Sequence, residues 1–546
     1  MSRSLVWLTF PVALVLACGG NRSGGDEALT AANEVGDSDG TDPSDDEAED
    51  GPLLDVNGAE GMMEAGDENG PGEGTACEQA AAYNSSQGCE FWAVDLPNAW
   101  QVSLGPSAEE QPFGIVVTNT ASETATVEVF VGQQAAPIES AEVPPGQLQV
   151  FKFGNSLGII SQGNTKGIAY RIESDRPVTA YQYNPLDNSN PVYSNDASLL
   201  FPTHVLDTDY TAITGDALWM VNANGGAFVT AIATEDDTTL IFYPPPGITM
   251  YEGDTTVTLD RGETYTMMSN EVTAIWQENA GQGNLSGLRV ASDKPVAVFS
   301  GNVCSWEPTP HEYCCCDHLE HQMLPLTAWG EAYIVSLAPP ASGTEDDDVR
   351  VRMVGSFDGT ALSYSPSAPP GAPTTLDAYE TVVFTTSSNF VVTGDKPFAV
   401  AEFLMSNEAV TVDPTPGDPM DNFFVGDPAM ILVPPSAQFQ NEYVFQVPAE
   451  YASNWVTVLR PSGATVELDG ADVSSDPTWK NVGVLDGVTW QRGHFPIAFG
   501  PHRVESPASQ GVGILVAGYD VAVSFGFAGG SGVEFQDEAP PPPPIP

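Results

Sequence analysis

The chain has 546 residues, with 74 acidic against 16 basic side chains and a formal net charge of −58 at pH 7. A chain of that sign repels phosphate backbones and has no basic cluster for anionic lipid head groups, so the composition argues against nucleic acid as a partner and against electrostatic membrane binding. With 41% hydrophobic residues and 24 Phe it has enough apolar material for large cores, which excludes disorder throughout.

The N-terminus carries an export signal. An apolar run over residues 5–16 follows Arg3, and it is too short for a spanning helix, which needs about 20 apolar residues. The run closes on Val15-Leu16-Ala17-Cys18-Gly19, which resembles the bacterial lipobox. The resemblance implies that residues 1–17 are a lipoprotein signal peptide and that Cys18 is lipidated. The alternative is an ordinary secretory signal, and both interpretations predict export; the anchored form predicts an outer-membrane or cell-surface lipoprotein.

Residues 18–76 have the composition of a tether. They are rich in Gly, Asp, Glu, Ala, Asn and Ser, contain Arg22 as their one basic residue and have no aromatic residue. Such a segment cannot bury enough apolar surface to offset the entropy of ordering it, and its like charges favour an extended chain. A calcium-binding role is the alternative, but the acids lack the spacing of an EF-hand loop. At the other end, residues 536–546 predict a short polyproline II tail.

The body, residues 77–535, reads as all-β. Short stretches rich in Val, Ile, Thr, Tyr and Phe alternate apolar with polar residues and end at Gly, Pro, Asn or Asp, as in Ile115 to Asn119, Ala125 to Phe130 and Gln147 to Phe153. Helical patterns of useful length are absent from the sequence.

A repeated unit indicates internal duplication. Its copies are Ser174-Asp175-Arg176-Pro177-Val178, Ser292-Asp293-Lys294-Pro295-Val296 and Gly394-Asp395-Lys396-Pro397-Phe398, with Gly518-Tyr519-Asp520-Val521 as a diverged fourth copy. The Asp and Pro are expected to make a turn between two strands.

Two further landmarks recur in phase with this unit. A Pro and a Tyr separated by eight residues open a strand, as Pro202 and Tyr210, Pro325 and Tyr333, and Pro435 and Tyr443. A hairpin follows, at residues 232–243, 351–364 and 455–468. The common period of about 110 residues predicts blocks at approximately 77–197, 198–320, 321–428 and 429–535.

Each block has the size of one β-sandwich, so packed sandwich units are expected, with exchange of strands between neighbours because the first block lacks the Pro–Tyr opening. The alternative is a β-propeller in which each block supplies two blades.

Six cysteines follow Cys18, an even number for an oxidising compartment, so three disulfides are the default. Cys77 and Cys89 are expected to pair where the tether meets the body. The other four are Cys304, Cys314, Cys315 and Cys316, whose connectivity cannot be read from the sequence. This loop continues into Asp317, His318 and His321, so a zinc site is conceivable, but the disulfides compete for the same sulfurs and no strong CxxC spacing occurs. We therefore expect neither a metal site nor a cofactor.

The body resembles a known family. The residues that carry the resemblance are Cys89-Glu90-Phe91-Trp92-Ala93, the repeated unit, and Cys316-Asp317-His318-Leu319 with Gln322, Leu324-Pro325, Trp329-Gly330 and Tyr333 downstream. Together they are similar to the N-terminal domain of IgGFc-binding proteins, over about residues 77–527. The resemblance implies an extracellular, non-enzymatic binding or adhesion domain, without implying that the ligand is immunoglobulin.

The candidate binding loop contains Trp306, Asp317, His318 and His321. Trp306 is expected to be an exposed anchor for the ligand. For His318 the structural interpretation, a hydrogen bond to backbone that caps the loop, is favoured over a role as ligand or base.

A hydrolase finds little support in the sequence. Motifs for a catalytic serine, a zinc protease or a phosphate loop are absent, and the acidic pairs read as solvated turns. The predicted function is a surface lipoprotein that binds a protein or glycan. The alternatives are a structural scaffold of the cell envelope and a secreted polysaccharide hydrolase with two distant carboxylates.

Overall fold

The computed structural model describes residues 75–535, except for 100–106, 155–156, 160–162, 187–193, 221–222, 271–272, 275–282, 309–315, 342–344, 407–424, 449–450, 510, 521–522 and 534. The predicted signal peptide, Cys18, nearly all of the tether and the Pro-rich tail lie outside this range, as do Cys314 and Cys315. No helix in the described part of the chain is long and apolar enough to cross a membrane.

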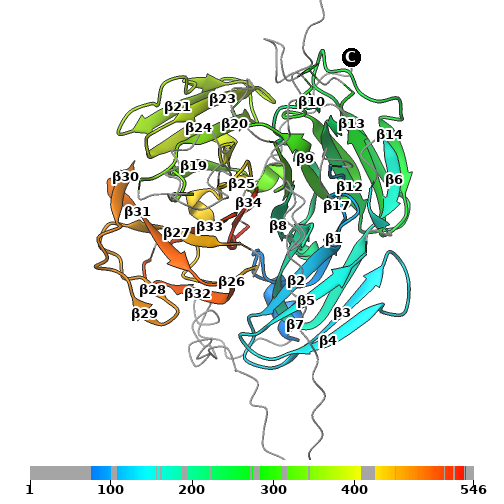
Figure 1. Ribbon diagram of the computed structural model, residues 1–546, viewed down its shortest axis with the longest axis horizontal. Coiled ribbons are helices and arrows are strands. Elements are labelled where there is room, and N and C mark those ends of the chain that lie inside the picture. The colour runs from blue at the N-terminus through cyan, green and yellow to red at the C-terminus, as the bar shows by residue number, and fades with distance from the viewer. Residues whose placement is uncertain are drawn as a thin grey trace, which may run out of the picture.

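The fold is all-β, as predicted, and its antiparallel strands fall into four groups along the chain (Figure 1). A short helix, α1 (Ala76–Ala81), precedes them, with Thr75 as its N-cap. The first group comprises β1 (Gly88–Ala93), β2 (Phe113–Asn119), β3 (Ala125–Val131), β4 (Glu139–Val143), β5 (Leu148–Phe153), β6 (Thr165–Ile168), β7 (Tyr170–Asn184) and β8 (Asp196–Leu200). The second comprises η3 (Thr203–Val205), β9 (Asp207–Thr211), β10 (Leu218–Met220), β11 (Ala223–Gly225), β12 (Ala227–Ala233), β13 (Thr238–Tyr243), β14 (Thr256–Leu259), β15 (Glu263–Met268), β16 (Thr273–Ala274), β17 (Arg289–Ser305) and β18 (Asp317–Gln322).

The later two groups follow the same order. The third comprises η4 (Leu326–Ala328), β19 (Gly330–Val335), β20 (Val349–Gly355), β21 (Thr360–Ser365), β22 (Thr375–Leu376), β23 (Thr381–Thr386), β24 (Phe390–Phe403) and β25 (Met430–Leu432). The fourth comprises η6 (Ser436–Gln438), β26 (Glu442–Val447), β27 (Ser453–Pro461), β28 (Glu467–Leu468), β29 (Ala471–Asp472), β30 (Lys480–Leu485), β31 (Val488–Ile497), β32 (Gly500–Glu505), β33 (Gly513–Asp520) and β34 (Val523–Ala528). The block boundaries at 197, 320 and 428 stay a prediction.

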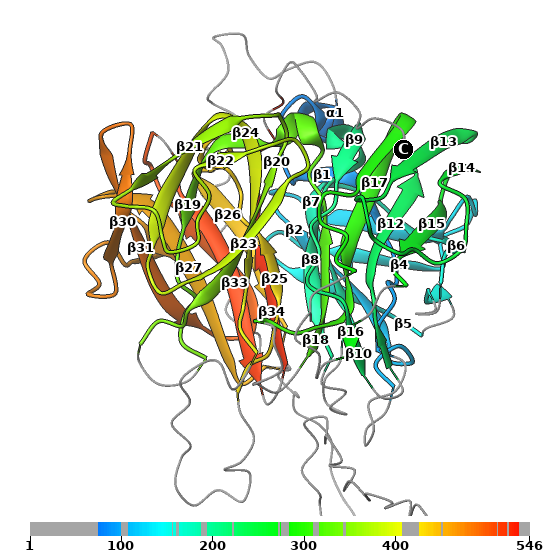
Figure 2. The same ribbon diagram turned by 90° about the horizontal axis from the view of Figure 1, so that it is seen from above.

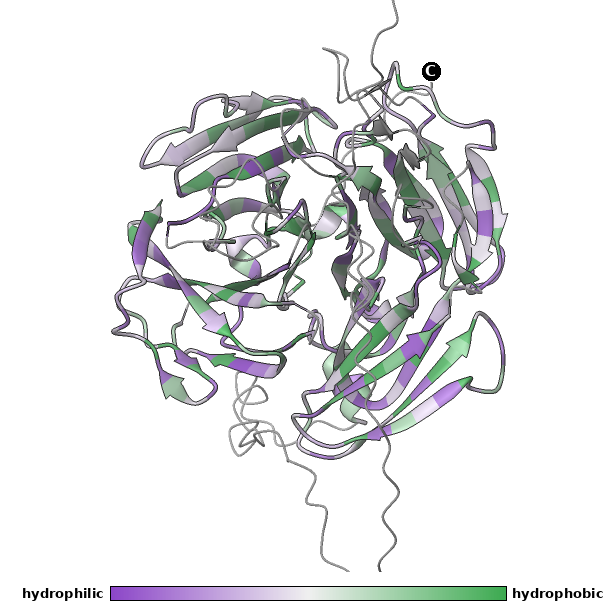
Figure 3. Ribbon diagram, viewed as in Figure 1, coloured by the Kyte–Doolittle hydropathy of each residue, from purple (hydrophilic) through white to green (hydrophobic). Residues whose placement is uncertain are grey.

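In the first three groups, two sheets share one long strand. The first half of β7 pairs with β1 and β3, whereas its second half pairs with β2 and β8. The inner sheets have the orders β8-β7-β2-β5, β18-β17-β12-β15, β25-β24-β20-β23 and β34-β33-β27-β31. The other sheets have the orders β1-β7-β3-β4, β9-β17-β13-β14, β19-β24-β21-β22 and β26-β32-β28-β29. These pairs of sheets form the predicted sandwich-like units, and polar and apolar residues alternate along their strands (Figure 3).

The four groups surround a common centre. The strands β8, β18, β25 and β34, which end the four inner sheets, contact one another and lie side by side in the middle of the molecule (Figure 2). The predicted exchange between neighbours is also present, because β6 of the first group pairs with β15 of the second.

The repeated Asp–Pro unit lies inside the long strand, so the predicted turn is wrong. In β17 the partner of Ala291 is Asp209 and the partner of Val296 is Asp207, which places residues 292–295 in a bulge. A bulge tolerates the Pro because the missing N–H is not needed for the ladder there. The proposed fourth copy is also wrong: Gly518 to Asp520 end β33, whereas the fourth long strand is interrupted between β32 and β33.

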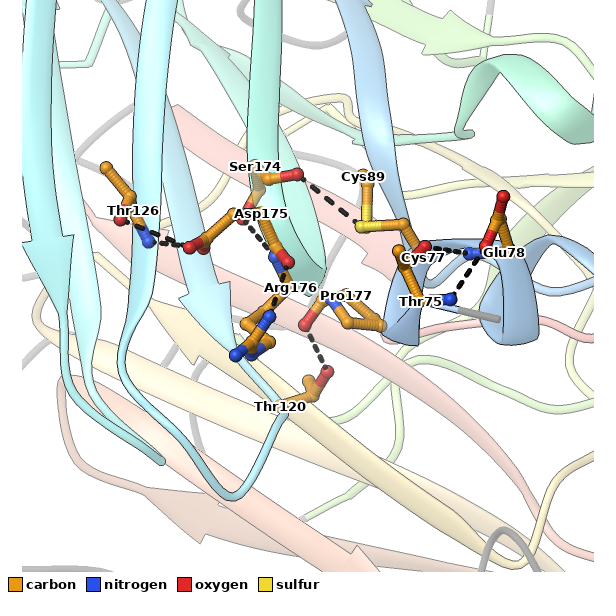
Figure 4. The surroundings of a disulfide bond; sticks show 10 residues. All are labelled: Thr75, Cys77, Glu78, Cys89, Thr120, Thr126, Ser174, Asp175, Arg176 and Pro177. Atoms are coloured by element: carbon orange, nitrogen blue, oxygen red, sulfur yellow. Dashed lines mark hydrogen bonds between the residues drawn. A yellow bond between two sulfur atoms is a disulfide. The ribbon is translucent and has the colours of Figure 1, made fainter. Parts of the chain in front are cut away.

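The bulges are held by the same hydrogen bonds in three groups. The carboxylate Oδ1 of Asp175, Asp293 and Asp395 accepts the backbone N–H of Thr126, Thr239 and Ala361, each at 2.7 Å. The following Pro carbonyl accepts a hydroxyl hydrogen bond from Thr120, Thr234 or Ser356. Figure 4 shows this arrangement around Asp175 and Pro177. The sequence repeat is therefore a repeated set of contacts, which we call the rim bonds.

The Pro–Tyr landmark has a structural cause as well. Each Pro is the N-cap of a 3₁₀ turn, and each Tyr is buried. The hydroxyls of Tyr210, Tyr333 and Tyr443 accept the backbone N–H three residues upstream at 2.9, 3.2 and 2.9 Å. Each Tyr thus fixes the path of the chain into the first strand of its group.

Candidate functional site

The predicted binding loop begins and ends beside the centre of the molecule. Cys304 and Cys316 form a disulfide with a Cα–Cα distance of 5.3 Å, which joins the end of β17 to the residue before β18. The bridge settles one pairing that the sequence left open. Because Cys316 precedes Asp317 directly, it also fixes the start of the central strand β18.

Asp196, the first residue of β8, connects all four central strands. Its Oδ1 accepts the backbone N–H of Ala197 at 2.9 Å and of Gly526 at 3.3 Å. Its Oδ2 accepts those of Glu320 at 3.1 Å and of Met430 at 3.2 Å. These donors belong to β8, β34, β18 and β25, so one carboxylate ties the four groups together.

Asp317 makes a second set of contacts at the same place. Its Oδ1 accepts the N–H of Asn195 at 2.7 Å and of His318 at 2.8 Å, and its Oδ2 accepts that of Ser524 at 3.3 Å. The Ser524 hydroxyl in turn accepts the N–H of Asp427 at 2.8 Å. We call Asp196, Asp317, Glu320 and Asp427 the acidic hub; all four are buried.

The surroundings of the acidic hub disfavour ionisation of its carboxyl groups. Burial raises the pKa of Asp317 well above its ordinary range, and the charges of Asp427 and Asp196 raise it further. Burial and then Asp196 raise the pKa of Glu320 in the same direction. Burial also raises the pKa of Asp196, but its four N–H donors oppose this shift and occupy its lone pairs. Burial therefore favours the protonated form of Asp317 and Glu320, and of Asp196 as well.

These contacts also define one face of the molecule. Asn195, Asp317, Asp427 and Ser524 lie at or just before the starts of the four central strands, and they are hydrogen-bonded to one another. The starts of β8, β18, β25 and β34 consequently meet at one end of the hub, which we call the hub face.

Comparison with known proteins gives this architecture a family. The model of the family described as IgGFc binding protein matches residues 196–518, more than half of the chain. The chain belongs to this IgGFc-binding family. The match starts at the hub residue Asp196 and ends in β33, so it includes three of the four central strands.

A human relative carries the same name. The human "IgGFc-binding protein" is 27% identical over 200 residues, which are 36% of the present chain and 3% of the human protein. The present IgGFc-binding family member therefore matches only a small part of the length of that relative.

The two histidines of β18, His318 and His321, are enclosed. Burial lowers the pKa of His318 to about 3 and that of His321 to about 4, so both rings are neutral at pH 7. His318 stacks on Phe228 with 5.9 Å between ring centroids, and His321 Nδ1 donates to the Gln322 carbonyl at 2.8 Å. In the described part of the chain no group of three His, Cys, Asp or Glu is arranged to hold a metal ion.

Trp306 is not an exposed anchor, so that prediction is wrong. Its side chain is only 7% exposed, because the adjacent chain is drawn inward on both sides. The Ser305 hydroxyl donates to the Asp216 carbonyl at 3.2 Å, and Glu307 N–H donates to the Ser406 hydroxyl at 3.1 Å. Asp317, His318 and His321 are buried too, so any part that they have in ligand binding is indirect and stays a prediction.

A buried ionic cluster adjoins this segment. Glu307 lies 2.7 Å from Arg350 Nε, while Asp216 lies 3.1 Å from Arg352 and 3.5 Å from Arg350. Because Asp216 and Glu307 belong to the second group and both Arg residues are in β20 of the third, the cluster fixes these two groups against each other. The loop that starts at Cys304 is thus attached to two groups at once.

The first disulfide lies where the chain enters the body, as predicted. Cys77 of α1 pairs with Cys89 of β1, and the Cys77 sulfur lies 3.6 Å from the Ser174 carbonyl oxygen next to the first bulge (Figure 4). Between the two cysteines, Ser86 N–H donates to the Ser531 carbonyl at 2.8 Å, and Ser85 bridges Gly532. The disulfide therefore holds the segment that joins the first group to the last.

Cavities in the described part of the protein are small. The best-defined cavity, lined by Ile213, Met323, Trp329 and Tyr333 among others, has a volume of about 20 Å³, and the next has about 10 Å³. These volumes hold one water at most, whereas small-molecule sites measure roughly 300–1,000 Å³. Neither of these two cavities is large enough for a small-molecule ligand.

Sequence reasoning missed Asp196 and Asp427. Each acid occurs singly, without a repeat or a motif, and its contacts with other strands span more than 90 residues of sequence. The one available signal was that Asp196 directly precedes the apolar run Ala197 to Phe201, where an acid marks a strand start that must find donors.

Proposed function

We propose that the protein is a non-catalytic receptor for a protein ligand, held outside the cell by a lipid on Cys18 and raised from the membrane by residues 18–76. Membership of the IgGFc-binding family carries the proposal, because the human relative is named for a protein that it binds. The anchor is supported by the lipobox-like Val15 to Gly19. A folded body of about 460 residues that follows an acidic segment without aromatics is consistent with display on a tether.

We further infer that the ligand is bound at the hub face. Loops on a rigid scaffold are the usual position for binding residues. The scaffold at the hub face is rigid because the starts of the four central strands are hydrogen-bonded to one another. The Cys304–Cys316 bridge also joins the end of β17 to the residue before β18.

Binding is tested with the human immunoglobulin G Fc fragment, with the Fab fragment as the control. Wild-type protein is expected to bind Fc, and the double substitution Cys304→Ser, Cys316→Ser is expected to weaken binding at least tenfold because it releases the connection before β18. The matched variant Cys77→Ser, Cys89→Ser opens a disulfide of equal sequence separation away from the hub face, so it should leave binding unchanged. Absence of Fc binding by wild type contradicts immunoglobulin as the ligand, and equal effects of the two variants contradict the hub face.

Anchorage is tested by protease shaving of intact cells. Wild-type protein is expected in the membrane fraction and sensitive to external protease, whereas Cys18→Ala is expected in the soluble or medium fraction. Wild-type protein that is fully protected from protease places the body in the periplasm and supports the scaffold alternative instead.

A further inference from the structure

Each inner sheet has a central strand at one end and another strand at the opposite end. These opposite-end strands differ in whether a further strand pairs with their outer edge. These strands are β5, β15, β23 and β31. The edge of β15 is covered by β6, which pairs with Glu263 to Thr266, and that of β31 by β30. Among the described residues β5 pairs only with β2, and β23 only with β20. Two of the four equivalent edges thus accept an antiparallel strand, and two present no strand partner.

The strands β15 and β23 begin with the same turn, so their residues can be matched one to one. Glu263 Oε2 accepts the N–H of Asp260 at 2.9 Å, and Glu380 Oε2 accepts that of Asp377 at 2.8 Å. Counting from this shared turn, Thr264 corresponds to Thr381 and Thr266 to Val383. Under β6, Thr264 and Thr266 are completely buried, whereas Thr381 and Val383 remain partly exposed. The position that β6 occupies on β15 is thus more open on β23.

The outer edge of β23 has main-chain groups that find no backbone partner among the described residues. Gly355 N–H donates to the Glu380 carbonyl. From this pair onward, every second residue of β23 is hydrogen-bonded to β20, and the residues between them are not. In an antiparallel pair every second residue turns its N–H and C=O away from the partner. The residues concerned are Thr381, Val383 and Thr385, and no backbone group elsewhere in the described chain bonds to them.

The sequence of β23 lacks the usual protection of an edge. Natural edge strands carry charges, above all Lys, or Pro, which discourage pairing with other chains. The other uncovered edge, β5, has Lys152. By contrast, β23 reads Thr-Val-Val-Phe-Thr-Thr, with β-branched and aromatic residues and no charge, in a chain with a net charge of −58.

We propose that the outer edge of β23 binds an extended segment of the protein ligand as an added antiparallel strand, in the way that β6 covers β15. The proposal rests on the proposed function as a receptor and names the manner of binding. The segment it fits is uncharged and rich in β-branched residues, because main-chain bonds give affinity while the flanking Thr and Val side chains exclude charge. A second copy of the chain is the poorer occupant, since two bodies of large negative charge repel each other.

The first experiment needs no ligand. Hydrogen–deuterium exchange of the full chain is expected to show the amides of Thr381, Val383 and Thr385 exchanging at least 100-fold faster than those of Thr264 and Thr266. Equal protection of both sets overturns the proposal, because the edge would then be covered by the protein's own chain.

The second experiment uses a displayed library of random peptides selected on the full chain. Enriched peptides are expected to be uncharged and β-branched, and to lose at least tenfold in affinity for Val383→Pro, which removes an outward N–H without removing a bond to β20. Val150→Pro in β5 is the matched control, because the bond from Asn119 N–H to the Gln147 carbonyl sets the same alternation there. Failure to enrich such peptides, or equal binding to Val383→Pro, overturns the proposal; thermal melting verifies that both variants fold.

Binding measurements with the Fc fragment distinguish a failure of this proposal from a failure of the proposed function. If wild type binds Fc and Val383→Pro binds it equally well, the receptor function stands and the role of β23 fails. If wild type does not bind Fc but the selected peptides require Val383, the edge site stands and the Fc ligand fails.

Discussion

The rim and the hub of this protein both depend on aspartates, but in opposite ways. At the rim, Asp175, Asp293 and Asp395 repeat one exposed hydrogen bond in three groups, and each acts within its own group. At the hub, Asp196 occurs once, is buried and accepts N–H groups from all four groups. Repetition therefore marks what each unit needs in order to fold, and a unique residue marks what joins the units.

The largest loss of stability is expected when the Asp196 carboxylate, which joins the four groups, is removed. Asp196→Ala leaves four backbone N–H groups buried without their acceptor, at a cost of roughly 1–3 kcal/mol each. We expect the free energy of unfolding to fall by about 4 kcal/mol or more in urea denaturation, against about 1 kcal/mol for Asp175→Ala. Equal losses for the two variants contradict the assignment of Asp196 as the joint between the groups.

The raised pKa of a buried acid predicts that stability falls as the pH rises from about 4 to 8. Burial, and then the charge of Glu109, raise the pKa of Asp95 from 3.8 to about 8. Below about pH 4 the carboxyl is protonated in both states, so its contribution is complete. Between pH 4 and 8 the unfolded chain releases the proton while the folded protein keeps it, and stability is progressively lost. We expect the melting temperature to fall over this window.

Asp95→Asn tests the assignment, because an amide does not titrate. The variant should show a shallower decline of the melting temperature between pH 4 and 8 and should exceed wild type at pH 8 by a few degrees. Glu402, whose pKa burial raises to about 8, is a second source of the same slope, so Asp95→Asn with Glu402→Gln should flatten it further. A slope that neither substitution changes would show that other groups cause it.

The rim was predictable from sequence and the hub was not, and the reason is physical. The Asp–Pro unit and the Pro–Tyr pair each recur in three of the groups, since local contacts impose the same residues each time. The turn assigned to Asp293-Lys294-Pro295 was wrong, because a bulge and a turn use the same residue types. Asp317 was noticed through the family motif, yet its partners Asn195 and Ser524 come from the first and fourth groups, which no local pattern reports.

The first disulfide is expected to contribute an intermediate amount. Cys77→Ser with Cys89→Ser opens a loop of 12 residues, for which the chain-entropy estimate is about 3 kcal/mol. The loss should appear first at the junction of the first and last groups, as faster proteolysis of residues 78–87. Retained protection of this segment in the double variant would show that the bonds of Ser85 and Ser86 suffice to hold it.

The smallest effect is expected at a single rim bond. Asp293→Asn keeps an oxygen for the Thr239 N–H but removes the charge from an exposed hydrogen bond, so the loss should be about 0.5 kcal/mol. Asp175→Asn and Asp395→Asn should cost the same amount, because the bond is repeated at the same length. The three losses should add in the triple variant, since the sites share no partner. Denaturant midpoints of the single and triple variants measure this, and a triple loss well above the sum would mean that the rim, like the hub, couples the groups.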